Sequence, residues 1–223
     1  MTIETIYNEL KDIIFNDGYD VIKYAKLKEN MEKEIRKNNS YKTSSKTRVN
    51  AILKVASKED FRPVLTGYGV YNDYKVVTDS YHLIAIKEEV LPLPLVTSDT
   101  EEAKKHRELY GDSSVVMGVY PNIQNIIDFK LLDKEYLETQ LKNGDYEELT
   151  IDVNDLTSFI AMNKKDKKAT YKVGENNYNA RFLKDIIDVI GKEAKLYTRG
   201  GVTPLYFIND KKEIGLALPI RNY

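Results

Sequence analysis

The 223-residue chain contains no cysteine, which excludes a disulfide framework, a thiolate nucleophile and a zinc site built on cysteine. It also has no apolar run near the roughly 18 residues of a membrane span. Charged residues interrupt the apolar positions of the N-terminal stretch MTIETIYNELKDII, so this stretch does not resemble a targeting segment. We therefore expect a soluble, cytoplasmic protein.

An excess of charge of one sign is lacking as well. Charged residues make up 31% of the chain, yet the formal net charge is only -1. This balance argues against attraction of the whole surface to nucleic acid or to an anionic membrane, and leaves room for local basic faces.

Signatures of catalysis are scarce. Only two histidines occur, His82 and His106, and neither lies at metal-ligand spacing from another strong ligand. The glycines of LTGYGVY and YTRGGVTP lack the spacing and the lysine of a phosphate-binding loop, and no serine lies in a nucleophile-elbow sequence. Asp185 and Asp188 could pair on one helix face for a metal, although a solvated face beside Lys184 is the preferred interpretation. We predict no enzyme, no cofactor and no metal.

Three helices are predicted before the first strand. Apolar periodicity indicates helices over residues 3–14 and 19–37, with a candidate linker at residues 38–40. A third helix, over residues 43–58, combines a narrow apolar stripe with positive charge on its other face. Its basic residues, with the lysine that precedes it, are Lys42, Lys46, Arg48, Lys54 and Lys58.

Residues 62–86, RPVLTGYGVYNDYKVVTDSYHLIAI, form the most informative stretch. The pattern predicts two strands joined by a turn at Asn72-Asp73, because the side chains of these residues can hydrogen-bond their own backbone. The second strand ends in the polar corner Thr78-Asp79-Ser80.

The remainder alternates short strands and helices. The LPLPLV run of residues 91–96 is expected to be extended, because proline lacks a donor and restricts its predecessor. Residues 164–168, KKDKK, form a basic loop. Helices are predicted over residues 100–110 (or a loop), 154–163 and 179–190, the last closed by Gly191, and strands over residues 115–120, 149–152, 169–173, 194–198, 205–209 and 214–220.

Four segments resemble the bacterial-type DNA polymerase sliding clamp, the beta subunit of the replicative polymerase. Residues 62–86 are similar to a strand of pattern R-x-x-L-x-G that leads to T-D-G-x-R-L-A, with Ser80 and His82 where the family has glycine and arginine. Tyr120-Pro121-Asn122 before IQNII is similar to the F/Y-P-D turn of the family. VGENNYNARFLKDIIDVIG resembles the N-x-x-Y/F-L-x-D-x-L strand and helix, and LALPIRNY resembles the terminal V-M-P-M-R-L.

The resemblance implies an α+β, DNA-clamp-like fold, with helices packed on antiparallel sheets and an extra N-terminal helical segment over residues 1–40. We favour one clamp-like domain over residues 41–146 and a second, trimmed one over residues 147–223. The alternative is a single clamp domain made from residues 41–95 and 169–223, with residues 96–168 inserted.

The implied function is that of a processivity factor in DNA replication. Clamps close a ring around duplex DNA, and lysines and arginines on the inner helices meet phosphates without reading bases. Here those residues would be Lys42, Lys46, Arg48, Lys54, Lys58, Arg181 and Lys184. Two domains per chain would suggest a homo-oligomeric ring of three chains.

The family also captures short peptides of polymerases and other replication proteins in an apolar pocket. Carried over by position, its wall would be Thr78, His82, Leu83, Pro121, Leu218, Pro219, Ile220 and Arg221. The competing interpretation makes Leu218 and Ile220 ordinary core residues of the last strand.

Two further functions stay open. One is a clamp-fold regulator or decoy, for instance of phage or mobile-element origin, that binds replication proteins without encircling DNA. The other is a metal-dependent nuclease that acts through Asp185 and Asp188, which the absence of a catalytic constellation disfavours.

Overall fold

The computed structural model describes residues 46–59, 61–88, 91–123 and 126–220. The chain divides into two compact units, residues 1–47 and 48–223. The two helices and the linker predicted within residues 1–40 lie outside the described residues. Residues 46–55 are helical, which confirms this part of the helix predicted over residues 43–58, whereas residues 56–58 are not helical. None of the described helices is long and apolar enough to cross a membrane.

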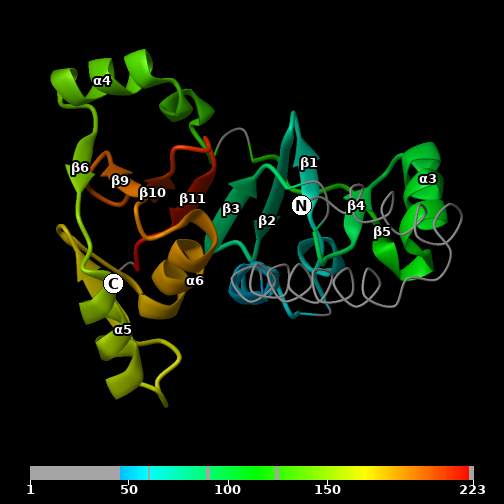
Figure 1. The fold of residues 1–223 in the computed structure, drawn as a ribbon, viewed down its shortest axis with the longest axis horizontal. Coiled ribbons are helices and arrows are strands. Elements are labelled where there is room, and N and C mark those ends of the chain that lie inside the picture. The colour runs from blue at the N-terminus through cyan, green and yellow to red at the C-terminus, as the bar shows by residue number, and fades with distance from the viewer. Residues whose placement is uncertain (1–45, 60, 89–90, 124–125, 221–223) are drawn as a thin grey trace, which may run out of the picture. The chain divides into compact units, whose positions relative to one another are not determined.

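A seven-stranded antiparallel sheet organises the second unit (Figure 1). Its strand order is β1-β2-β3-β11-β10-β9-β6, so the late strand β11 lies between β3 and β10 in the middle of the sheet. The strands are β1 (Gly69–Tyr71), β2 (Tyr74–Thr78), β3 (His82–Ile86), β6 (Glu147–Leu149), β9 (Lys195–Thr198), β10 (Leu205–Ile208) and β11 (Ile214–Ala217). The predicted α+β class with helices on an antiparallel sheet is confirmed.

The stretch of residues 62–86 contains three strands, not two. Asn72, at φ 53°, and Asp73 form the predicted turn between β1 and β2. The polar corner then reverses the chain again, so that Thr78 of β2 pairs with Leu83 of β3. The corner is therefore a second hairpin turn inside the sheet.

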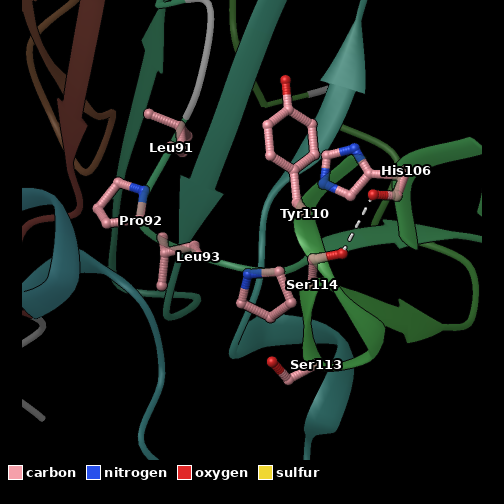
Figure 2. A pocket seen from close by; sticks show the side chains of 8 residues that line it. Leu91, Pro92, Leu93, His106, Tyr110, Ser113 and Ser114 are labelled. Carbon is pink, nitrogen blue, oxygen red and sulfur yellow. Dashed lines mark hydrogen bonds between the residues drawn. The ribbon is translucent and has the colours of Figure 1, made fainter. Parts of the chain in front are cut away.

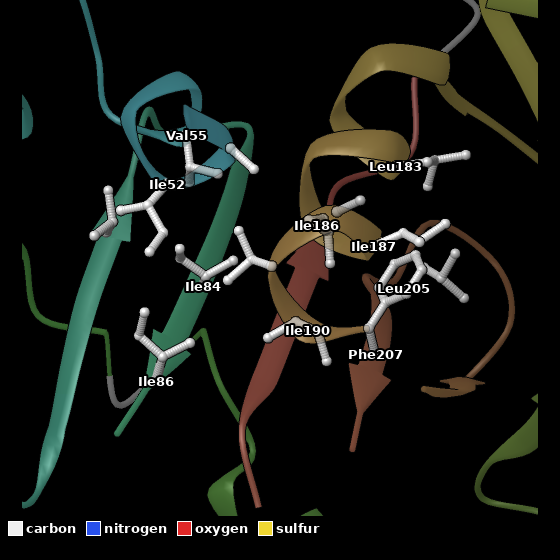
Figure 3. Close-up of a cluster of buried hydrophobic side chains, with 14 of the residues drawn as sticks. Ile52, Val55, Ile84, Ile86, Leu183, Ile186, Ile187, Ile190, Leu205 and Phe207 are labelled. Atoms are coloured by element: carbon white, nitrogen blue, oxygen red, sulfur yellow. The ribbon is translucent and has the colours of Figure 1, made fainter. Parts of the chain in front are cut away.

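One face of the sheet is covered by helix 46–55 and by α6 (Ala180–Ile190), as Figure 3 shows. Asn179 caps α6 by accepting the Arg181 backbone N–H at 3.0 Å, and Gly191, at φ 111°, ends it, as predicted. The side chains that fill this core include Ile52, Val55, Val77, Ile84, Ile86, Leu183, Ile186, Ile187, Ile190, Leu205 and Phe207. Alternate residues of the strands therefore pack against the helices on this face.

The opposite face is covered by residues 120–146, which hold η3 (Phe129–Leu132) and α4 (Lys134–Asn143). In this segment the sequence predicts only the turn at residues 120–122. Its core comprises Tyr74, Val76, Leu83, Ala85, Ile123, Ile127, Leu131, Tyr146, Tyr197, Tyr206, Ile214 and Leu216. Both faces of the sheet are thus buried, which explains why β3 reads as a continuous apolar run.

Smaller elements flank the sheet. The parallel pair β4 (Leu95–Thr97) and β5 (Val115–Met117) is joined by α3 (Thr100–Tyr110) and η2 (Asp112–Ser114), and η1 is Pro63–Leu65. On the other side, α5 (Val153–Met162) is followed by the hairpin of β7 (Thr170–Val173) and β8 (Asn176–Asn179). β8 was not predicted, because its asparagine-rich sequence has low β propensity.

Candidate peptide-binding site

A pocket of about 550 Å³ lies beside the start of α6 and the tail that follows β11. Apolar and aromatic side chains dominate its wall. The lining residues are Tyr81, Lys168, Thr170, Asn179, Phe182, Val202, Leu218, Pro219 and Ile220.

The tail that follows β11 is held in an extended form beside the pocket. The backbone N–H of Leu218 donates to the Tyr81 carbonyl at 3.0 Å, and that of Ile220 donates to the Asn177 carbonyl at 2.8 Å. The Leu218 and Ile220 side chains are nevertheless 37% and 39% exposed, beyond the last residue of β11. They are not core residues of the last strand, so that competing interpretation is wrong.

Phe182 lies on a buried histidine. The rings of Phe182 and His82 are stacked, with centroids 4.2 Å apart and planes 8° from parallel, and His82 is only 1% exposed. Tyr81 stacks more loosely on the same phenylalanine at 6.3 Å. His82 therefore supports the pocket wall from below and does not line it.

The polar corner holds His82 in place. Asp79 Oδ1 lies 2.9 Å from His82 Nδ1 and accepts the backbone N–H groups of Tyr81 and His82. Burial raises the pKa of Asp79, but the hydrogen bonds from His82 and Tyr81 outweigh it and leave the pKa below its ordinary value. Ser80 adopts φ 80°, a left-handed conformation that favours glycine, the residue found there in the clamp motif.

The residues predicted to form the pocket wall occupy three kinds of position. Leu218, Pro219 and Ile220 line the pocket. Thr78 is buried and donates its hydroxyl to the His82 carbonyl at 2.8 Å, while Leu83 faces the opposite core.

Pro121 is exposed and does not line this pocket, because it belongs to the segment that covers the other face of the sheet. Arg221 lies outside the described residues. The pocket residues that sequence reasoning missed are Tyr81, Lys168, Thr170, Asn179, Phe182 and Val202. Tyr81, an aromatic residue in an otherwise polar turn, was the available signal for an exposed apolar surface.

The chain is similar to solved structures of bacterial beta sliding clamps. The DNA polymerase sliding clamp of Bacillus subtilis matches with a TM-score of 0.47 and 14% identity, over 81% of this chain and 63% of that one. The Helicobacter pylori beta clamp bound to a DNA ligase peptide matches with a TM-score of 0.46 and 14% identity, over 78% and 62%. The C. crescentus beta sliding clamp matches at 0.43 and 18%, over 79% and 63%.

These matches concern the fold alone. The chain spans less than two thirds of the length of each of these clamps. No family model matches the sequence, and no curated protein matches it either.

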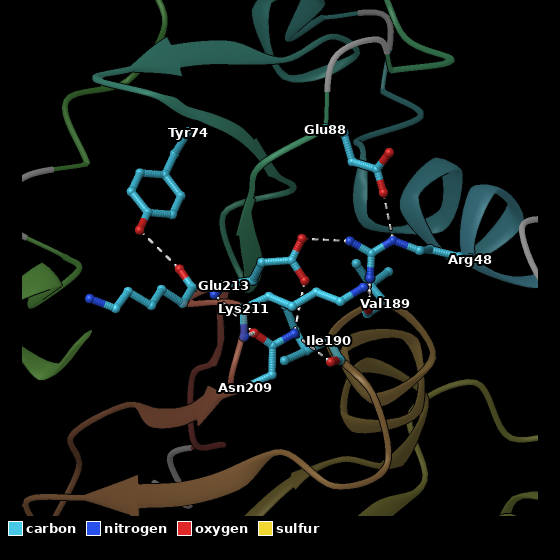
Figure 4. Close-up of polar contacts among 9 residues, drawn as sticks. Arg48, Tyr74, Glu88, Val189, Ile190, Asn209, Lys211 and Glu213 are labelled. Atoms are coloured by element: carbon cyan, nitrogen blue, oxygen red, sulfur yellow. Dashed lines mark hydrogen bonds and ion pairs between the residues drawn. The ribbon is translucent and has the colours of Figure 1, made fainter. Parts of the chain in front are cut away.

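Arg48, predicted to contact DNA, is engaged inside the protein (Figure 4). Its Nη2 lies 2.7 Å from Oε1 of the buried Glu213, its Nε lies 2.8 Å from Glu88 Oε1, and its Nη1 donates to the Val189 carbonyl at the end of α6. Asn209 completes the network by donating to Glu213 Oε2 at 2.8 Å. The arginine therefore ties helix 46–55 to α6 and to the β10–β11 turn.

Two more of the predicted DNA contacts are paired with carboxylates. Lys54 Nζ lies 3.4 Å from Asp185 Oδ1, and Lys184 pairs with Asp188 one turn along α6. Asp185 is 9% exposed, so the prediction that both aspartates lie on a solvated face is wrong for this one, which turns toward helix 46–55. Burial raises the pKa of Asp185 above its ordinary value, although Lys54 opposes the shift.

The remaining predicted DNA contacts differ in environment. Lys46 and Lys58 are exposed, whereas Arg181 donates from Nη2 to the Lys164 carbonyl at 2.6 Å. Lys42 lies outside the described residues. The described cations thus do not form one continuous free basic face.

A second hollow, of about 270 Å³, lies between residues 91–94 and α3 (Figure 2). His106 and Tyr110 of α3 pack against each other there, with ring centroids 4.6 Å apart. Burial, and secondarily the charge of Lys75, lowers the pKa of His106. Ser114 Oγ donates to the carbonyls of Gly111 and His106 and not to the imidazole, so His106 does not activate Ser114 as a nucleophile.

The described part of the chain shows no candidate metal site. Among those residues no group of three or more histidine, aspartate or glutamate side chains could hold a metal ion. Asp185 and Asp188 in particular each face a lysine.

Proposed function

We propose that this protein binds short peptide segments of DNA replication proteins in the pocket beside α6. The observation that carries the proposal is an apolar wall formed by the exposed Tyr81, Val202, Leu218 and Ile220 together with the partly buried Phe182. Its volume of about 550 Å³ suits a ligand site, since such sites run to roughly 300–1,000 Å³. The four sequence segments that resemble sliding clamps name the class of partner, and one of them forms the tail of this wall.

Two roles are compatible with peptide binding, and the ion pairs favour the one without DNA encirclement. Arg48, Lys54 and Lys184 are held by carboxylates of the same chain, and a paired cation neutralises few additional phosphates. We therefore favour a clamp-fold regulator that occupies replication proteins. The second candidate is a processivity factor that encircles duplex DNA as a ring, which the exposed Lys46 and Lys58 support.

Peptide titration tests the pocket. A fluorescein-labelled clamp-binding peptide from a replicative polymerase is titrated against wild type, Ile220→Asp and the control Val119→Asp, an apolar residue that is 77% exposed and does not line the pocket. A buried carboxylate should cost the complex at least ~1.4 kcal/mol, or tenfold in Kd. We expect that loss for Ile220→Asp and less than a twofold change for Val119→Asp. Binding that is absent, or equal in wild type and Ile220→Asp, contradicts the proposal.

The two roles are separated by oligomeric state. The mass of the protein is measured in solution with and without nicked circular DNA. For the favoured role we expect that the protein binds the peptide and is not retained on the circular DNA. A three-chain ring retained on circular DNA and released by linearisation would select the processivity factor instead.

A further inference from the structure

The basic loop of residues 164–168 lies at the mouth of the pocket. It carries four lysines and one aspartate, all of them exposed. Within the described part of the chain none of the four ammonium groups has an ion-pair partner, in contrast to Arg48, Lys54 and Lys184. Asp166 offsets one of the four positive charges, so the loop keeps a formal charge of +3 (four lysines less one aspartate), and its Oδ1 accepts the backbone N–H of Lys168 at 2.8 Å to close the turn.

The loop is fixed to the pocket by the first residues of α6. Asn179 Nδ2 donates to the Lys167 carbonyl at 3.1 Å, and Arg181 Nη2 donates to the Lys164 carbonyl at 2.6 Å. The Ala180 N–H also donates to the Ala169 carbonyl at 3.0 Å. Because Asn179 itself lines the pocket, these bonds set the positions of the lysines relative to the apolar wall.

The charge of the pocket is one-sided. Lys168 is one of its lining residues, and no aspartate or glutamate is among them. Like charges on a loop whose backbone is tied down repel one another and gain from an anionic partner, most strongly at low ionic strength. A nucleic acid backbone would satisfy the lysines, but it has no side chains to fill the apolar wall.

We propose that the pocket takes a peptide in which apolar anchor residues are flanked by aspartate or glutamate, and that the loop of residues 164–168 binds these carboxylates. The inference rests on the proposed function and adds to it the chemical class of the peptide. The apolar wall supplies burial, and the loop supplies orientation and a faster encounter.

The test uses two labelled peptides with the same length and the same apolar anchors, one flanked by Asp-Asp-Glu and the other by Asn-Asn-Gln. Each is titrated against wild type and against a loop variant, at about 50 and 300 mM salt. The loop variant is Lys164→Gln, Lys165→Gln, Lys167→Gln and Lys168→Gln. Its backbone carbonyls, which make the bonds to α6, are unchanged.

A control variant removes the same charge elsewhere. It carries Lys104→Gln and Lys105→Gln in α3, Lys142→Gln in α4 and Lys192→Gln just after Gly191, all at exposed lysines. We expect wild type and the control to prefer the acidic peptide by about tenfold in Kd at the lower salt concentration, which corresponds to ~1.4 kcal/mol of binding free energy. The preference should fall to within threefold in the loop variant and at the higher salt concentration.

The outcomes separate the two proposals. Equal binding of both peptides by wild type overturns the role of the loop and leaves the peptide pocket standing. No binding of either peptide overturns the proposed function. Retention of the preference in the loop variant, or its equal loss in the control, also contradicts the inference. Binding of duplex DNA that the loop variant loses, without any peptide preference, would assign the loop to nucleic acid.

Discussion

Replacement of Arg48 by methionine tests whether this arginine belongs to the structure or to a DNA-binding face. Methionine preserves most of the aliphatic stem and removes the guanidinium. The variant loses the ion pairs to Glu213 and Glu88 and the hydrogen bond to the Val189 carbonyl.

The magnitude depends on the burial of Glu213. Its side chain is 4% exposed, and among the described residues the hydrogen bond from the Asn209 side-chain amide is the one that its carboxylate keeps after the substitution. Loss of one partner of a buried pair typically costs ~3–5 kcal/mol, because the other charge stays desolvated. Arg48 is 22% exposed, so water can reach part of the vacated space, and we expect a loss of about 3 kcal/mol.

Glu213→Gln and the double variant complete a thermodynamic cycle. The glutamine can still accept from Asn209 and carries no charge, so Arg48→Met should cost far less in this background. We expect a coupling free energy of about 1–3 kcal/mol.

The assay is urea unfolding followed by circular dichroism, with Lys58→Met as a matched control for the loss of a cation. Lys58 is exposed, so its substitution should change the free energy of unfolding by less than about 0.5 kcal/mol. Additive effects of Arg48→Met and Glu213→Gln, or equal effects of Arg48→Met and Lys58→Met, would refute the structural role of Arg48.

Three further predictions concern single side chains. Gly215→Ala would place a Cβ 2.3 Å from Cγ2 of Ile186, so it should lower the free energy of unfolding by about 1–3 kcal/mol. In urea unfolding the same substitution should cost less when it is made in an Ile186→Ala background, where that methyl group is absent. Asp185→Asn removes a carboxylate whose pKa is raised by burial, so the variant should be more stable than wild type near pH 7. This gain should shrink as the pH falls through the raised pKa and should vanish below about pH 3.8. Thermal unfolding at pH 7 that shows no gain contradicts this prediction. Asp128→Ala leaves Arg199 without its carboxylate at 3.1 Å and should cost about 1–2 kcal/mol, with faster amide hydrogen exchange in residues 129–143 as its signature.

Local signals in the sequence were sufficient for most of the elements. The Asn72-Asp73 turn and the Gly191 stop each depend on the chemistry of one or two residues, and both are found in the structure. The prediction failed for β8, whose asparagine-rich sequence has low β propensity and which is a strand through its pairing with β7. α4 was missed too, because it is exposed along most of its length and shows a weak apolar stripe.

The candidate site shows the same division. Leu218 to Ile220 could be named from the tail motif, but which residues face them depends on the arrangement of α6, the β3 corner and the loop after β9. Phe182 and Val202 come together only in the folded chain. The pairing of Arg48 with Glu213, 165 residues apart in sequence, could not be inferred from a helix pattern that marks only charge.

The place of β11 in the sheet has a consequence for synthesis. Residues 214–217 join β3 to β10, so a nascent chain in which they are still inside the ribosome has two separate groups of strands with open edges. The pairing of β11 with β3 is also highly non-local, and such contacts form slowly. During translation, the β1–β3 hairpins would have to wait, with the pairing edge of β3 uncovered, until residues 214–217 had emerged.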